Sequence, residues 1–155
     1  MSAHPHAALA TLLLLAACAS PREPALVVPL APSAANAGSL ARANLLPADD
    51  GTRIELFFSA AGPQPGIPLH VYTYLYEGRC TALPATPAYS LNDRVLVHTA
   101  HGQLASSRRG DFRLSHQMPM TLGELASGRY ALALRAAPAD GGDVLYCGDL
   151  RVTVG

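Results

Sequence analysis

The chain has 155 residues with 11 basic and 11 acidic side chains, so its formal net charge at pH 7 is zero. A chain without net charge has no overall field that attracts nucleic acid, an acidic lipid surface or a charged substrate. We therefore expect no nucleic-acid partner, and the length fits a single folded domain.

An unbroken apolar run, AALATLLLLAA, covers residues 7–17. It is too short for a permanent membrane-spanning helix and has the length of the apolar region of an export signal. It ends in Leu15-Ala16-Ala17-Cys18, which resembles the lipobox of bacterial lipoproteins. The resemblance implies a signal peptide over residues 1–17 and a mature chain that starts at a lipidated Cys18. An ordinary signal peptide with a chance cysteine is the alternative.

Acyl chains such as palmitate on Cys18 would anchor the protein in a membrane, because each buried methylene contributes about 0.8 kcal/mol. Residue 19 is Ala and not Asp. By resemblance to lipoprotein sorting in Gram-negative bacteria, this favours the outer membrane, facing the periplasm. A Gram-positive cell surface stays open.

Residues 19–45 are rich in Pro, Ala and Ser and have no sustained periodicity. This composition predicts a flexible tether, so we divide the mature chain into an anchor and disordered linker (18–48) and a folded domain (49–155). Within the linker, only Leu26 to Val28 is a candidate for pairing with a sheet edge.

From residue 51 the hydrophobic pattern has a period of two, which is typical of half-buried strands. A first strand is predicted over Thr52–Ser59, followed by a loop rich in Gly and Pro. A second strand is predicted over residues 69–76, with two faces. One face carries Leu69, Val71, Thr73 and Leu75, and the other carries His70, Tyr72, Tyr74 and Tyr76.

Further strands are predicted over residues 94–101, 111–116, 129–136 and 143–154, and one helical turn over residues 122–126. The Asp and Gly residues between the last two strands favour a tight reversal, which predicts a hairpin. This spacing indicates an all-β fold, either an antiparallel β-sandwich or a small Greek-key barrel.

Two short segments resemble copper/zinc superoxide dismutase-like and chordin-type β-sandwich domains. The stretch Tyr74-Leu75-Tyr76-Glu77-Gly78-Arg79-Cys80 resembles the family's His-x-His-Glu-Gly-x-Cys motif, and Tyr146-Cys147-Gly148-Asp149-Leu150 resembles its final strand. The segment SGRYALALRA resembles the strand before it. The resemblance implies a disulfide between Cys80 and Cys147. Two cysteines besides Cys18 also fit pairing in an exported chain.

The chain departs from this family at the metal ligands. Tyr74 and Tyr76 stand where the motif has two histidines, and Arg135 stands where a third would lie. A phenol must lose a proton with a reference pKa of about 10 before it binds a metal, and a guanidinium has no lone pair to offer. We therefore expect no copper site, no cofactor and no dismutase activity.

The row Tyr72, Tyr74 and Tyr76, together with Arg135, has two interpretations. In one, the rings pack under a loop or against another sheet. In the other, they form an aromatic surface that recognises a protein or glycan partner in the cell envelope, with Arg135 stacked on a tyrosine ring. Recognition by an exposed row predicts that Ala at Tyr74 and Tyr76 leaves folding intact.

Other chemistry has little support in the sequence. A metal site rebuilt from His70, His98, His101 and His116 is one alternative, although a spacing of three on a strand sends His98 and His101 to opposite faces. An enzyme of another type is a second alternative, but there is no Gly-x-Ser-x-Gly motif. We expect a non-enzymatic, membrane-anchored lipoprotein with a structural or partner-binding sandwich.

Overall fold

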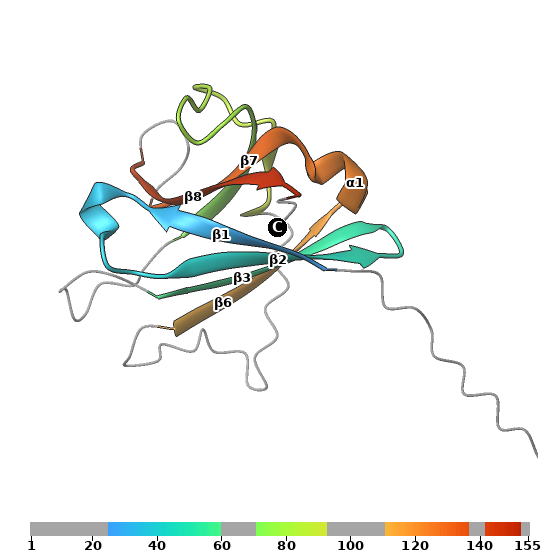
Figure 1. Ribbon diagram of the computed structural model, residues 1–155, viewed down its shortest axis with the longest axis horizontal. Helices are drawn as coiled ribbons and strands as arrows, with labels where there is room; N and C mark the ends of the chain where they lie inside the picture. Colours follow the sequence, from blue (N-terminus) through green and yellow to red (C-terminus); the bar gives the residue numbers. More distant parts are fainter. Residues whose placement is uncertain (1–24, 60–70, 93–110, 137–141, 153–155) are drawn as a thin grey trace, which may run out of the picture.

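The computed structural model describes residues 25–59, 71–92, 111–136 and 142–152 (Figure 1). Their regular structure is almost entirely strand. The elements are β1 (Leu26–Pro32), η1 (Ala34–Asn36), β2 (Ala41–Ala48), β3 (Gly51–Ser59), β4 (Tyr72–Glu77), β5 (Tyr89–Ser90), β6 (Asp111–Met118), α1 (Leu122–Leu125), β7 (Ser127–Arg135) and β8 (Val144–Arg151).

All paired strands are antiparallel and belong to one curled sheet with the order β5-β4-β7-β8-β1-β2-β3-β6. Strand β1 joins two halves of this sheet, because Leu26 to Leu30 pair with β2 whereas Ala31 and Pro32 pair with β8. In Figure 1, β1, β2, β3 and β6 form one layer, and β7 and β8 lie over it. The predicted all-β class is confirmed.

The main core lies between the two halves and is built by the alternation that the sequence shows. Ile54 and Leu56 of β3 and Leu132 and Leu134 of β7 are fully buried. Residues of the opposite parity lie on the outer side of each half. The protein therefore has two outer faces, one on β4, β7 and β8 and one on β1, β2, β3 and β6.

The predicted tether is wrong for residues 26–48. This segment forms β1 and β2, which pair with each other over Leu26 to Leu30, and Val28, Leu30 and Leu45 belong to the main core. In β2, the buried residues Ala43 and Leu45 alternate with more exposed ones. Small residues and prolines make this alternation hard to recognise in the sequence. The described fold therefore includes residues 26–48, which the sequence analysis assigned to the linker.

Predicted strands 52–59 and 111–116 correspond to β3 and β6, and the expected final hairpin is the β7–β8 pair. The predicted helical turn is α1, which begins with a capping box between Thr121 and Glu124. The reversal before β3 needs glycine: Gly51 has φ +128°, and an added Cβ would lie 2.3 Å from the carbonyl oxygen of Met118.

The predicted strand 94–101 lies outside the described residues, as do the signal peptide 1–17, Cys18 and the start of the second predicted strand. Among the described helices, none has the length and apolar character that crossing a membrane requires.

Candidate functional site

The tyrosine face is the outer side of β4, β7 and β8. Its first row of side chains is Tyr72, Tyr74 and Tyr76 on β4, and the register places Arg135, Ala133 and Ala131 of β7 directly opposite them. The small alanines leave space beside the rings. Tyr74 and Tyr76 contact each other with ring centroids 6.3 Å apart and ring planes tilted by 59°, an arrangement that aromatic pairs favour.

Arg135 is bound to this cluster through the hydroxyl end of a tyrosine. Its Nη1 donates a hydrogen bond to the hydroxyl of Tyr76 at 2.9 Å, and its Nε donates to the carbonyl of Gly142 at 2.8 Å. The second terminal nitrogen also donates to the Gly142 carbonyl. The expected ring stacking is thus replaced by a hydrogen bond, because the guanidinium reaches the polar tip of the side chain.

A disulfide closes the cluster from the other side. Cys80 follows β4, and its bond to Cys147 of β8 confirms the predicted pairing. Cys147 lies opposite Ala133, which itself lies opposite Tyr74, so the bridge continues one row across three strands. Leu83 from the loop after Cys80 packs against the same cluster. In Figure 1 the yellow-green segment that contains this loop lies on the outer side of β7.

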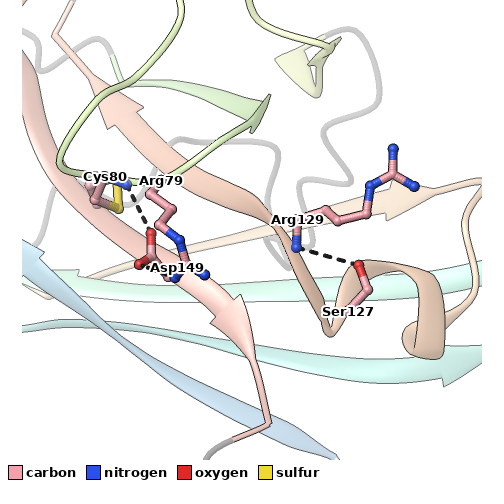
Figure 2. Close-up of polar contacts among 6 residues, drawn as sticks. Arg79, Cys80, Ser127, Arg129 and Asp149 are labelled. Atoms are coloured by element: carbon pink, nitrogen blue, oxygen red, sulfur yellow. Dashed lines mark hydrogen bonds and ion pairs between the residues drawn. A yellow bond between two sulfur atoms is a disulfide. The ribbon is translucent and has the colours of Figure 1, made fainter.

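Polar contacts fix the start of this loop next to the disulfide (Figure 2). The backbone N–H of Cys80 donates to Asp149 Oδ1 at 2.8 Å, and Arg79 Nη1 lies 3.6 Å from Asp149 Oδ2. At the other end, the backbone N–H groups of Ala88 and Leu91 donate to carbonyls of β4. Residues 78–92 are therefore held to β8 near their start, by Asp149 and the disulfide, and to β4 near their end.

Burial decides between the two interpretations of the tyrosine row. Tyr74 is 7% exposed and Tyr76 is 0% exposed, whereas Tyr72 is half-buried. A recognition surface needs exposed rings, so Tyr74 and Tyr76 do not form one in this conformation. Packing under a loop, the alternative interpretation, describes their position. The expectation that Ala at both positions leaves the fold intact is corrected accordingly, because large buried rings cost about 3–5 kcal/mol to delete.

The tyrosine cluster lacks the imidazole nitrogens that would bind a metal ion. Tyr76 already accepts a hydrogen bond from Arg135, and a cation placed there would be repelled by the guanidinium. Within the described ranges, no group of three or more His, Cys, Asp or Glu side chains is arranged to hold a metal ion. The arrangement is a hydrogen-bonded packing unit.

His116 is the one predicted metal-site histidine within the described residues. It faces the main core from β6 with 1% of its surface exposed, and its Nδ1 lies 2.9 Å from the Leu91 carbonyl. Among the described residues, its Nε2 has no hydrogen-bond partner. Burial lowers the pKa of His116 below its ordinary value, with the Leu91 contact acting in the opposite direction. His70, His98 and His101 lie outside the described residues.

One cluster was missed by the sequence analysis. On the opposite outer face, Arg42 of β2, Phe57 of β3 and Arg113 of β6 form a row. The only signal was an aromatic residue on the polar side of its strand, and Arg42 lay in the predicted tether. The row becomes visible only when the register of three strands is known.

No protein-family model, curated protein or solved structure matches this chain at a significant level.

Proposed function

We propose that the protein is a lipid-anchored lipoprotein of the bacterial cell envelope, held at the outer membrane and facing the periplasm. Its β-sandwich has a structural or partner-binding role and no catalytic one. The anchor is supported by the apolar run over residues 7–17 and the Leu15-Ala16-Ala17-Cys18 sequence that ends it. The Cys80–Cys147 bond supports export, because disulfides persist in oxidising compartments.

The observation that carries the non-catalytic role is the hydrogen bond between Arg135 and Tyr76 inside a closed cluster. In the family that the sequence resembles, metal-binding histidines stand at the positions of Tyr74, Tyr76 and Arg135. Here the polar groups satisfy one another, and the disulfide and the loop over residues 78–92 cover the rings. A covered, internally satisfied cluster stabilises a scaffold and leaves no open coordination position for a substrate.

Copper or zinc binding through rebuilt ligands is a second candidate, favoured by the buried Nε2 of His116, which has no hydrogen-bond partner within the described part of the chain. Metal analysis of the purified, oxidised protein separates the two candidates. Stoichiometric copper or zinc would support the rebuilt site, and a protein that stays metal-free after incubation with either ion would support the scaffold.

Replacement of Cys18 tests the anchor directly. In cells fed labelled palmitate, the parent chain is expected to carry the label and sediment with membranes, because acyl chains partition into the bilayer. The Cys18→Ser variant is expected to lose the label and to leave the membrane fraction. The matched control is the double variant Cys80→Ser/Cys147→Ser, which keeps the lipobox and should keep the label. A parent chain without label would refute the proposal.

A further inference from the structure

The outer side of β1, β2, β3 and β6 carries cationic side chains that are held by an aromatic ring. The guanidinium carbons of Arg42 and Arg113 each lie 4.9 Å from the ring centroid of Phe57. Both distances are within the range of cation–π contacts. Phe57 therefore holds two guanidinium groups on an exposed sheet face, and we name this side of the four strands the arginine face.

A third arginine, Arg53, lies on the same face between Leu46 and Gln117. Arg42, Arg53 and Arg113 are all exposed. Among the described residues, the two ion pairs involve other arginines, Arg79 with Asp149 and Arg129 with Glu77. The guanidinium groups of the arginine face therefore keep their donors available to an external acceptor.

Near the arginine face, acidic side chains are fewer than arginines or lie at the edge of the face. Glu55 lies between the row of Arg42 and the row of Arg53. Asp49 and Asp50 lie in the turn between β2 and β3. Among the described side chains, this face thus presents three arginines against Glu55, and no ion pair joins Glu55 to any of them, so any attraction of the face to an anion is local.

Strand β1 adds exposed apolar surface directly beside the arginines. Val27 is 55% exposed, and Pro29, which lies opposite Arg42, is also exposed. Leu40, immediately before β2, is 80% exposed. Apolar side chains next to arginines fit the boundary between lipid headgroups and acyl chains, where the apolar parts leave water and guanidinium groups reach phosphates.

The position of β1 limits how far this face can lie from an acylated Cys18. Residues 19–25 separate Cys18 from Leu26, the first residue of β1. A fully extended chain spans about 3.5 Å per residue, so this segment reaches at most roughly 28 Å. Leu26 pairs with Leu45, between the positions of Asn44 and Leu46 on the arginine face.

We propose that the arginine face docks on the anionic, phosphate-bearing headgroup layer of the membrane that holds the acyl chains of Cys18. This inference rests on the proposed lipid anchor. The anchor brings the domain to the surface, and the arginine face sets its orientation, with the tyrosine face pointing away from the lipid.

Vesicle binding of the unacylated mature chain tests the docking without the anchor. The chain from residue 18 onward, with Cys18→Ser and an oxidised disulfide, is mixed with vesicles of phosphatidylglycerol and phosphatidylcholine or of phosphatidylcholine alone. We expect stronger partitioning into the anionic vesicles and a decrease with added salt. The double variant Arg42→Gln/Arg113→Gln should lower partitioning roughly 25-fold, about fivefold for each arginine.

The matched control is Arg129→Gln/Arg151→Gln, which removes the same charge from the other half of the sheet and should change partitioning less than twofold. Equal losses in both double variants, or no partitioning into anionic vesicles, would overturn the docking proposal. The two proposals fail separately. A parent chain that carries no palmitate label would refute the lipid anchor. A labelled parent chain whose unacylated form does not bind anionic vesicles would refute only the docking.

Discussion

The two outer faces of the sheet combine the same kinds of side chain and differ in what covers them. On the tyrosine face, Tyr76 is fully buried in a cluster with the disulfide and Leu83 of the loop over residues 78–92, and Arg135 donates a hydrogen bond to its hydroxyl. On the arginine face, Phe57 lies between Arg42 and Arg113, whose guanidinium groups are exposed. The cluster around Tyr76 is thus a second core, whereas the cluster around Phe57 lies on the surface.

This difference shows that burial under a loop changes which polar groups of a cluster need a hydrogen-bond partner. Under a loop, a polar tip without a partner costs free energy, so the Tyr76 hydroxyl is paired with Arg135. On an open face, water solvates the guanidinium groups, and a ring without a hydroxyl is enough to hold them. Tyr and Phe are thus placed where their polar or apolar tips fit.

Removal of the disulfide should have the largest effect on the difference between the covered tyrosine face and the exposed arginine face. The bond closes a loop of 147 − 80 + 1 = 68 residues, which stabilises the fold by about 4 kcal/mol in the chain-entropy model. In Cys80→Ser/Cys147→Ser we expect a decrease of this size in the free energy of unfolding, measured by denaturant titration. Reductant should destabilise the parent chain by a similar amount and leave the variant unchanged.

Hydrogen exchange of the same variant localises the loss. The amides of residues 78–92 should exchange faster, while those of β2 and β3 keep their protection under conditions where global unfolding is rare. Equal acceleration on both halves would show that the disulfide does not act as a cover of the tyrosine face.

A smaller effect is expected for Tyr76→Phe, which removes one hydroxyl from the covered cluster. The Nη1 donor of Arg135 loses its acceptor in a partly buried place, so the free energy of unfolding should fall by about 1–2 kcal/mol. Tyr72→Phe is the matched control, because this ring is half-buried at the margin of the cluster, and it should cost less than about 0.5 kcal/mol. Equal costs for both would contradict a special role of the Arg135 bond.

The smallest effect is expected for Phe57→Ala on the open face. The ring loses two cation–π contacts but fills no closed space, so a cost of about 1 kcal/mol is expected in thermal or chemical unfolding. A loss as large as that of a buried ring, about 3–5 kcal/mol, would mean that this face is covered in the folded protein.

Much of the fold was predictable because alternation of apolar residues reports burial directly. The stretch from Thr52 to Ser59 has a strict period of two and forms β3 with that pattern of burial. In β1, the candidate pairing of Leu26 to Val28 is confirmed, but the rest of the strand was assigned to the tether because Pro29 and Pro32 are typical of linkers. Strand β1 pairs with β8 only at Ala31 and Pro32, so over Leu26 to Leu30 one side of the strand behaves as a sheet edge, where Pro29 is tolerated.

By itself, the sequence determined the alternation of side chains, the tyrosine row on one side of β4 and the pairing of the two domain cysteines. These features depend on neighbouring residues or on a motif. Only the tertiary structure decided which outer face is covered and which rows form across strands. Cover requires Leu83 of the loop over residues 78–92 to pack on the tyrosine cluster, and the row of Arg42, Phe57 and Arg113 requires the register of three strands. Such contacts between distant segments are set by packing of the whole domain, which no local pattern records.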